Sequence, residues 1–384
     1  MKVTIVMGFF LPVPPLAGGA TEKIWLRLGE LMAADGHDVT IISRRWPGLP
    51  ARERHGRLEH RRVGGIRHTR WLPLNLLLDF LWGCRVLPVL PTGDIVVCNT
   101  VLLPVFLRFI RPAAGRVAVV LGRMPKGQGR FYGGVDLVLA TSTAVANKAR
   151  AENQDLADRI FQFPNPIDWH LHAAAAVQGD AGRPLTIAYV GRIHPEKGLE
   201  QLLDAAVMLA KDPGLPHWRV RLVGPVDVAQ GGGGPAYRDG LIRNYQSALG
   251  DRLEVVPPVF DAAALARIYG ETDVFCYPSL AAQGEGLSIA PIEAMAAGSV
   301  PVVSQLDCYR DLIAPGINGY QFDQTKASAR SELAGILHRL LDDPALRRRA
   351  AQEAQATARR FDYAQTARLL LDRFARLTAS GTRR

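Results

Sequence analysis

The sequence predicts an α/β protein of two domains, each built around a parallel sheet. Strand-like and helix-like segments alternate along the whole chain, as expected when parallel strands are joined by helical crossovers. At 384 residues the chain is long for one such domain and sufficient for two cores. The segment 163–168, Phe-Pro-Asn-Pro-Ile-Asp, interrupts this alternation with two prolines and predicts a linker. We therefore expect an N-terminal domain over 1–165 and a C-terminal domain over 166–362.

The expected strands are short apolar runs bounded by turn residues, and the helices are longer amphipathic runs between them. In the first half the strands lie near 3–7, 39–42, 95–98, 117–121 and 137–140, and the helices near 21–34, 74–87, 101–110 and 142–151. In the second half the strands lie near 185–190, 219–223, 253–256, 274–276 and 300–303, and a last helix near 364–377.

The composition is that of a soluble globular protein. Hydrophobic residues make up 48% of the chain, and the mean hydropathy is +0.04. No uncharged apolar run approaches the roughly 18–20 residues that a transmembrane helix needs. The apolar start, 2–10, predicts an opening strand rather than a signal peptide, because a glycine turn and a helical run follow at once. The four cysteines are isolated, which predicts neither disulfides nor zinc and suits a reducing cytoplasm.

The most informative segment is 284–298, Gly-Glu-Gly-Leu-Ser-Ile-Ala-Pro-Ile-Glu-Ala-Met-Ala-Ala-Gly. It lies between two strand-like runs, 273–278 and 300–304, and therefore predicts the loop and helix of a βαβ unit. The helix is expected to begin near Pro291, because proline is tolerated in a first turn where its missing N–H would be unpaired anyway. Loop amides and a helix N-terminus together favour an anion such as a diphosphate.

Two carboxylates bracket this expected anion site, Glu285 before the helix and Glu293 inside it. A carboxylate gains nothing from a phosphate, so hydroxyl groups are its more suitable partners. The ordinary alternative is that Glu285 is a loop charge and Glu293 a solvated helix residue. The apolar residues on all sides of Glu293 instead favour burial, and a buried glutamate needs partners. A phosphate flanked by hydroxyl-binding groups describes a nucleotide sugar.

A second motif, 189–198, Tyr-Val-Gly-Arg-Ile-His-Pro-Glu-Lys-Gly, follows a strand and opens a helical run. Gly191 lets the backbone leave the strand sharply. Arg192 and Lys197 bring a planar guanidinium and a mobile ammonium near one helix start, which suits a dianionic group. Without the downstream motif, two basic residues in such a loop are more often solvated surface; with it, phosphate binding is the better interpretation.

These two segments resemble those of the large family of retaining GT-B glycosyltransferases, group 1 (family 4). The G-R-x-x-x-x-K-G loop and the E-x(7)-E pattern match in the expected order, and the resemblance covers nearly the whole chain, more weakly in the first half. It implies two facing Rossmann-like domains, with a nucleotide sugar held mainly by the C-terminal one. It also implies that the C-terminal segment, 363–384, forms a helix that crosses back to the N-terminal domain.

The resemblance also assigns site residues. Arg192 and Lys197 would hold the diphosphate, Glu285 the hydroxyls of the donor sugar, and Glu293 the ribose. The remaining donor-binding positions are Gly191, Gly286, Leu287 and Ser288. Neither a metal nor another cofactor is expected, because the arginine and the lysine take the place of a divalent cation. Family frequency favours a UDP-sugar donor, with GDP-mannose as the runner-up.

Two loops of the first half are candidates for the acceptor side. The loop 12–19 follows the first strand, at the edge where α/β sheets bind ligands. There, Gly18 and Gly19 either let backbone amides approach the donor phosphates or form a simple turn. Many relatives carry a histidine after a mid-domain strand, but here that place holds Arg123, Lys126 and Arg130. These cations either stabilise the departing phosphate or hold a phosphorylated acceptor.

The net charge of +10 comes entirely from the first half. Residues 1–165 hold 22 Lys and Arg against 12 Asp and Glu, whereas residues 166–384 hold 24 of each. Nine arginines and three histidines lie between Arg44 and Arg70, and the apolar run 71–82 follows directly. An anionic membrane surface attracts such a pair. A solvated basic loop followed by a core helix explains it about equally well, and nucleic acid is a poorer interpretation because no binding motif accompanies the charge.

The sequence thus predicts a retaining, metal-independent glycosyltransferase of the cytoplasm, or of the inner face of the membrane. The acceptor would be a glycan, a lipid-linked molecule or another anion in cell-envelope or polysaccharide biosynthesis. A phosphorylase or epimerase of the same fold is less well supported, since no cofactor-lysine motif is present. A catalytically silent nucleotide-sugar-binding or scaffold protein is the alternative from another class, and the missing histidine favours it.

Overall fold

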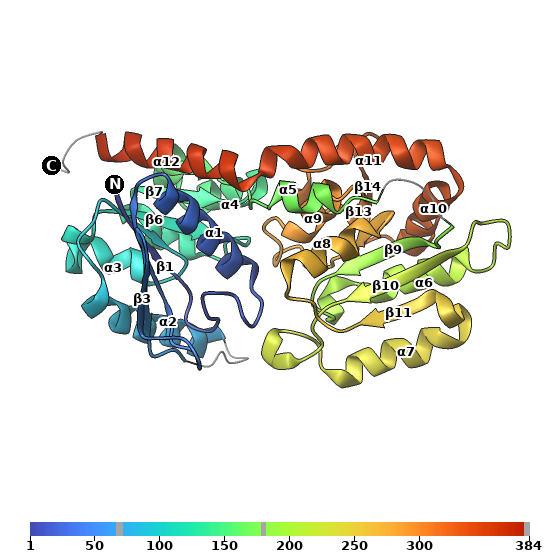
Figure 1. The fold of residues 1–384 in the computed structure, drawn as a ribbon, viewed down its shortest axis with the longest axis horizontal. Coiled ribbons are helices and arrows are strands. Elements are labelled where there is room, and N and C mark those ends of the chain that lie inside the picture. Colours follow the sequence, from blue (N-terminus) through green and yellow to red (C-terminus); the bar gives the residue numbers. More distant parts are fainter. Residues whose placement is uncertain (67–71, 178–181, 380–384) are drawn as a thin grey trace. The chain divides into compact units, whose positions relative to one another are not determined.

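The computed structural model of the chain describes residues 1–66, 72–177 and 182–379, and it divides into two compact units (Figure 1). The first contains Met1–Pro166 together with the C-terminal helix that begins at Tyr363, and the second contains Ile167–Asp362. The boundary lies within the predicted linker, 163–168. Each unit is an α/β structure around its own sheet.

The first unit has an eight-stranded sheet in the order β3-β4-β2-β1-β5-β6-β7-β8, parallel except for the antiparallel pair β3 and β4. Its strands are β1 (Lys2–Val6), β2 (Asp38–Arg44), β3 (Arg52–His55), β4 (Leu58–Val63), β5 (Ile95–Cys98), β6 (Arg116–Leu121), β7 (Leu137–Ala140) and β8 (Ile160–Gln162). Its helices are α1 (Ala20–Ala34), α2 (Leu72–Val86), α3 (Leu103–Ile110), α4 (Thr143–Glu152) and α12 (Tyr363–Ala379), which packs against α1.

The second unit has a fully parallel six-stranded sheet in the order β11-β10-β9-β12-β13-β14. Its strands are β9 (Leu185–Val190), β10 (Trp218–Val223), β11 (Leu253–Val256), β12 (Val274–Tyr277), β13 (Val300–Ser304) and β14 (Tyr320–Phe322). Its helices are α5 (Trp169–Ala174), α6 (Leu199–Leu209), α7 (Pro235–Leu249), α8 (Ala262–Gly270), α9 (Ile289–Ala296), α10 (Ala329–Asp342) and α11 (Pro344–Ala358).

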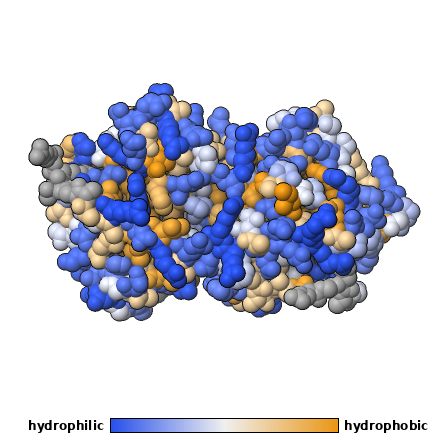
Figure 2. Space-filling model, turned by 90° about the horizontal axis from the view of Figure 1, so that it is seen from above, coloured by the Kyte–Doolittle hydropathy of each residue, from blue (hydrophilic) through white to orange (hydrophobic). Residues whose placement is uncertain are grey.

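The central strands are continuous apolar runs because helices cover both faces of each sheet. Every residue of β5, β7, β9, β12 and β13 is buried. All ten strands expected from the sequence are present, and their ends lie within two residues of the expected ones. In each unit hydrophilic side chains predominate on the surface that Figure 2 shows, in keeping with the mean hydropathy near zero.

Part of the basic run of the first half folds as a ribbon of two strands rather than as a solvated loop. β3 and β4 pair antiparallel and extend the sheet beyond β2. Arg61 in β4 donates two hydrogen bonds of 2.9 Å to the carboxylate of Glu59 and one to the carbonyl of Val89. Three residues of the basic run, Arg67, His68 and Arg70, lie outside the described residues.

Arg62 in the same strand is a structural residue. Its side chain is fully buried and forms an ion pair of 2.9 Å with Glu53. It also donates to the carbonyls of Val13 and Pro50, so it links β4 to the loop after β1. The expectation that this run is a solvated loop is therefore wrong for β3 and β4, because paired carboxylates and carbonyls hold several of its arginines in the fold.

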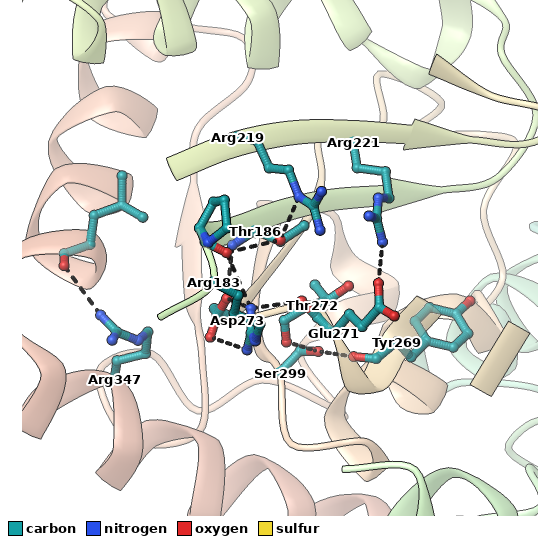
Figure 3. Close-up of polar contacts among 12 residues, drawn as sticks. Arg183, Thr186, Arg219, Arg221, Tyr269, Glu271, Thr272, Asp273, Ser299 and Arg347 are labelled. Carbon is teal, nitrogen blue, oxygen red and sulfur yellow. Dashed lines mark hydrogen bonds and ion pairs between the residues drawn. The ribbon is translucent and has the colours of Figure 1, made fainter. Parts of the chain in front are cut away.

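A polar network fixes the N-terminal ends of the second sheet (Figure 3). Arg183 binds Asp273 through two hydrogen bonds of 2.7 and 2.9 Å, and Asp273 also accepts from the amide of Thr186 in β9. Arg221 of β10 donates to Glu271 at 2.8 Å. The charges are paired at the end of the sheet opposite to the one where α/β proteins bind ligands, so this network serves the fold.

The chain enters and leaves the second unit at one place. Ile167 and Asp362 form a parallel bridge, and the amide of Ile167 donates to the carbonyl of Phe361 at 2.9 Å. The second unit is therefore inserted into the first, which the helix α12 completes.

Candidate active site

Three of the predicted site residues form one buried cluster at the C-terminal ends of β9 and β12. The Lys197 ammonium bonds to Oε1 of Glu285, and both side chains are more than nine-tenths buried. Ser288 donates to Oε2 of Glu285 at 2.7 Å, and Ser279 donates to Oε1 at 2.9 Å. The structure thus brings together the G-R-x-x-x-x-K-G loop and the start of the E-x(7)-E segment.

Both members of the central ion pair are charged at neutral pH. Burial opposes ionisation of Glu285, but Lys197 and the two serine hydroxyls outweigh it and lower the pKa of this carboxyl below its ordinary value. Burial likewise opposes the charge on Lys197, but Tyr277 and Glu285 raise the pKa of the ammonium above its ordinary value. The cluster therefore presents one fixed cation and one fixed anion.

Aromatic side chains surround this pair on the protein side. The Lys197 ammonium lies 5.2 Å from the ring centroid of Tyr277, which stacks on Tyr189 with centroids 5.5 Å apart. The hydroxyl of Tyr309 lies 3.3 Å from the Ser288 hydroxyl oxygen and donates to it. These rings keep the ion pair in a low-dielectric environment, where its electrostatic effect on a ligand is strong.

The helix α9 begins directly at the cluster. Ser288 is its N-cap residue, but the serine hydroxyl makes no capping hydrogen bond and points to Glu285 instead. An N-cap serine ordinarily accepts from an amide of the first turn. Pro291 is the third residue of the helix, in agreement with the expected start. The amide end of the helix is thus left uncapped by that side chain, as an anion-binding helix terminus requires.

Glycine at two positions allows the Lys197 loop to pack this closely. Gly198 has φ of 64° and ends the turn that carries Lys197, and a Cβ atom there would lie 2.1 Å from the carbonyl oxygen of Pro278. At Gly191 a Cβ atom would lie 2.5 Å from the hydroxyl of Tyr189, which donates to the carbonyl of Arg192. A larger residue at position 198 would push the loop away from the end of β12, and one at position 191 would collide with the Tyr189 side chain of β9.

Arg192 is not part of the cluster. Its guanidinium bonds to Oε1 of Glu196 at 2.5 Å and to the carbonyl of Gly231 at 2.8 Å. About a third of its side chain is exposed, 32%. The predicted phosphate clamp is thus two separately paired cations, of which only Lys197 lies beside Glu285.

Glu293 lies one helical turn beyond the start of α9 and is 2% exposed. Its Oε1 lies 3.5 Å from Nε2 of His172 in α5. The hydroxyl of Tyr269, at the end of α8, hydrogen-bonds to the same carboxylate. The prediction that Glu293 is buried with partners therefore holds, and its contact with ribose stays a prediction.

In the first unit, Gly18 and Gly19 lie at the end of the loop between β1 and α1. Gly19 has φ of 108°, and a Cβ atom there would lie 2.2 Å from the carboxylate of Glu22. Glu22 is 5% exposed, and burial raises its pKa to about 7, although its own amide acts in the opposite direction. The glycine loop thus encloses a carboxyl group that titrates near neutral pH.

The loop after β6 presents the three predicted cations. Arg123, Lys126 and Arg130 are exposed, and their side chains have no hydrogen bond or ion pair within the described part of the chain. Glu152, the last residue of α4, accepts from the amides of Gly127 and Gly129 at 2.7 and 2.9 Å. One carboxylate therefore fixes the loop through its backbone and leaves its three positive charges uncompensated.

Sequence reasoning missed Ser279, Glu196 and Glu152. Glu196 stands four residues after Arg192, but the two do not lie on one α-helix, where this spacing would predict an ion pair. Ser279 and Glu152 reach their partners through the tertiary fold, and no local pattern marks them. Over the described ranges no group of three or more His, Cys, Asp and Glu gathers as a metal site, and no helix is long and apolar enough to span a membrane.

Known proteins resemble this chain in sequence and in fold. Residues 174–357 match the family described as glycosyl transferases group 1. The phosphatidyl-myo-inositol mannosyltransferase of Mycobacterium tuberculosis is 24% identical over 416 residues, which cover 100% of this chain and 99% of that protein. The D-inositol 3-phosphate glycosyltransferase of Xylanimonas cellulosilytica is 29% identical over 282 residues, 68% of this chain and 63% of that protein.

Solved structures show the same fold. Sucrose-phosphate synthase from Thermosynechococcus elongatus superposes with a TM-score of 0.79 at 21% identity, over 99% of this chain and 100% of that one. The Anabaena protein HepE in complex with UDP and glucose gives a TM-score of 0.71 at 18% identity, over 98% and 100%. The chain is therefore a glycosyltransferase of the GT-B fold, and its residues 174–357 match the glycosyl transferases group 1 family.

Proposed function

We propose that this glycosyltransferase moves a sugar from a nucleotide-diphosphate donor to a phosphate-bearing acceptor, with retention of configuration and without a metal ion. The observation that carries the donor part is the cluster of Lys197, Glu285 and Ser288 at the start of α9. A fixed ammonium and uncapped helix amides suit a diphosphate, and the adjacent carboxylate suits sugar hydroxyls.

On the donor side, Lys197 and Arg192 stabilise the diphosphate, together with the backbone of Gly286, Leu287 and Ser288. Glu285 accepts from hydroxyls of the transferred sugar, and Glu293 accepts from the ribose. The base stays open between uridine and guanosine. One relative is named a mannosyltransferase and one solved structure holds UDP with glucose, so UDP-glucose and GDP-mannose are the donors to test first.

The state of Glu285 supports a reaction without a protein nucleophile. Its two oxygens accept hydrogen bonds from Lys197, Ser279 and Ser288, and its pKa is lowered, so it is a poor nucleophile and a good hydroxyl acceptor. In the proposed reaction the bond between the sugar C1 and the phosphate oxygen breaks. The acceptor oxygen bonds to C1 on the same face, and its proton passes to the departing phosphate, whose growing charge Lys197 stabilises.

On the acceptor side, the unpaired cations Arg123, Lys126 and Arg130 support an anionic acceptor. The two relatives are named for phosphatidyl-myo-inositol and for D-inositol 3-phosphate, both of which carry a phosphate on inositol. We extend that shared chemistry to this chain: the acceptor is a polyol or glycan that bears a phosphate, either free or as part of a lipid headgroup. Arg123 and Lys126 hold the phosphate.

The first unit also supports peripheral attachment to an anionic membrane. α2 is fixed on its inner side, where Trp82 donates to the carbonyl of Met7 and Asp79 accepts from the amides of Val101 and Leu102 at the start of α3. The outer side of α2 is also apolar, and it is exposed. Its exposed apolar side chains are those of Leu74, Leu76, Leu77, Phe80 and Leu81. An apolar outer face beside basic residues is typical of helices that lie in the membrane interface.

The test combines binding with turnover. Thermal shift with UDP, GDP and ADP identifies the base, since a ligand at 100 times its Kd stabilises by about 2.7 kcal/mol. Hydrolysis of the matching nucleotide sugar in EDTA then measures activity without a divalent cation. Glu285→Gln should retain nucleoside diphosphate binding and lose most hydrolysis and transfer. Unchanged turnover in Glu285→Gln, or activity abolished by EDTA and restored by a divalent metal, contradicts the proposal.

A further inference from the structure

Two buried side chains from two other helices lie against Glu293. His172 in α5 is fully buried, and its Nε2 lies 3.5 Å from Oε1 of Glu293. Tyr269 at the end of α8 is 1% exposed, and its hydroxyl hydrogen-bonds to the same carboxylate. Three helices, α5, α8 and α9, therefore meet at one motif glutamate.

The imidazole of His172 is otherwise without polar partners. Neither ring nitrogen makes a hydrogen bond to the described residues, and its ring packs edge-on against Tyr269 with centroids 5.5 Å apart. Burial of a polar ring whose nitrogens make no hydrogen bond is unfavourable. An apolar residue at this position would fill the same space without the cost of burying two ring nitrogens. The orientation of His172 toward Glu293 therefore indicates a role through that carboxylate.

Both partners of Glu293 are themselves held in place. The Ser299 hydroxyl lies 3.2 Å from the carbonyl oxygen of Tyr269 and 2.8 Å from that of Thr272, which fixes the turn after α8 (Figure 3). Asp168 caps α5 by accepting from the amide of Leu171 at 3.0 Å. His172 and Tyr269 thus approach Glu293 from rigid supports and limit the rotamers that its side chain adopts.

We propose that His172 and Tyr269 are positioning residues that orient the carboxylate of Glu293 toward the ribose hydroxyls of the donor. This inference rests on the proposed function, in which Glu293 binds ribose. A glutamate has three rotatable bonds and loses rotamer entropy when it binds. Two fixed side chains that restrict it beforehand reduce this loss, and they leave the remaining acceptor capacity of the carboxylate for the ligand.

The experiment compares ligands that do and do not carry the hydroxyls. Dissociation constants of UDP and GDP, and of their 2′,3′-dideoxy analogues, are measured by calorimetry for the wild type, His172→Phe and Tyr269→Phe. The wild type should prefer the ribose form of the nucleotide that it binds by about tenfold or more, the loss expected when hydrogen bonds to a charged group are removed. In both variants this preference should fall to about twofold or less.

A matched control comes from the same helix. His170 in α5 is exposed, and His170→Phe should keep the full ribose preference. Tyr269→Phe removes a single hydroxyl and keeps the ring packing, so it serves as the second variant if His172→Phe folds poorly.

The outcomes separate this inference from the function on which it rests. If the wild type binds neither nucleotide, or binds both forms equally, the ribose role of Glu293 fails and this inference falls with it. If the wild type prefers ribose and both variants keep that preference, the positioning role alone is overturned. A loss of thermal stability with an unchanged preference would assign His172 and Tyr269 to the fold only.

Discussion

At the scale of single residues, Lys197 and Glu285 are both charged and both buried, two properties that usually conflict. A buried ion pair is costly to desolvate, and removing one partner leaves an uncompensated charge. Here three donors hold the carboxylate of Glu285, and the ring of Tyr277 faces the ammonium. The site therefore holds a buried cation without leaving either charge unpaired in the free protein.

Lys197→Ala should therefore affect both catalysis and stability. The turnover number should fall by about a hundredfold or more, because the lost cation stabilises the charge that develops on the departing phosphate. The free energy of unfolding should fall by about 3–5 kcal/mol, because Glu285 is left buried and unpaired. Donor hydrolysis and urea unfolding measure the two effects.

Two other variants serve as comparisons for Lys197→Ala. Lys211→Ala, at an exposed position after α6, should leave both quantities unchanged. Arg192→Ala should cost less stability than Lys197→Ala, because its pair with Glu196 is partly exposed. A near-normal turnover number with only a raised KM in Lys197→Ala would indicate uniform ground-state binding instead.

Glu22 should make stability depend on pH between its ordinary pKa of 4.5 and its folded pKa of about 7. Between these values the folded protein binds a proton that the unfolded chain releases, so the Glu22 contribution falls as the pH rises and levels off above 7. The full change is of order 3 kcal/mol. Glu22→Gln, which does not titrate, should gain stability relative to the wild type between pH 4.5 and 7.5, as measured by urea unfolding.

A constant difference between Glu22→Gln and the wild type over that range would show that Glu22 titrates near its ordinary value. Glu30→Gln, at a partly exposed position on the same helix, is the matched control and should follow the wild type at each pH.

At the scale of elements, α2 and the β3–β4 ribbon would have distinct parts in the proposed membrane attachment. The ribbon uses Arg61 and Arg62 inside the fold, so only its exposed arginines, Arg52, Arg54 and Arg57, and Arg45 after β2, are available to lipid. Neutralising Arg62 would break a buried ion pair, and a variant that included it would confuse unfolding with lost binding. The exposed face of α2 supplies the apolar part.

The protein should bind vesicles that contain anionic lipid at low salt and dissociate as the ionic strength rises. The double variant Leu77→Gln and Phe80→Gln should bind several-fold less tightly, because both side chains are exposed on α2 and each buries apolar area in the bilayer. Arg52→Gln with Arg54→Gln should weaken binding as well, since each basic residue near the surface adds about 1 kcal/mol. Sedimentation with vesicles measures both.

Leu369→Gln in α12 changes a comparably exposed leucine of the same unit and should leave vesicle binding unchanged. If the wild type does not bind anionic vesicles even at low salt, the proposal of membrane attachment is wrong. A soluble phosphorylated acceptor is then the remaining candidate.

The loop after β6 should determine affinity for the acceptor rather than for the donor. Arg123→Ala with Lys126→Ala should raise the KM for an acceptor that carries a phosphate by about tenfold or more, because two charge-assisted contacts are lost. Donor hydrolysis should stay at the wild-type rate, since that reaction needs no acceptor. Inositol phosphate and unphosphorylated inositol are suitable probes. Equal KM values in the variant and the wild type would remove the loop from the acceptor site.

At the scale of the whole molecule, the sequence predicted the parallel core far better than the edges. β5, β7 and β9 have the expected bounds because fully buried strands are continuous apolar runs between turns. β3 and β4 were not predicted, since β3 has no apolar residue and β4 has four polar residues between its two apolar ends, so the ribbon resembles a basic loop. The arginines that stabilise it find their partners only in the tertiary fold, as Arg62 does with the carbonyl of Val13.

In the candidate site, too, residues marked by a local motif were predicted and residues that depend on the tertiary fold were not. Lys197, Glu285 and Ser288 were predicted together because two local motifs mark them, and the structure joins those motifs. Their supports were not predictable, because Ser279 and Tyr309 have no spacing that identifies them. His172 lies at the linker, more than a hundred residues before Glu293, and no sequence pattern connects the two.

The bridge between Ile167 and Asp362 has a consequence for biosynthesis. A ribosome releases the residues of the second unit as one uninterrupted segment, so that unit can complete its core while the first still lacks α12. Until Tyr363 and the residues after it emerge, α1 lacks the helix that packs against it and the first unit exposes apolar surface to solvent. Premature termination near Asp362 would therefore yield a chain whose second unit is folded and whose first unit is a substrate for chaperones and proteases.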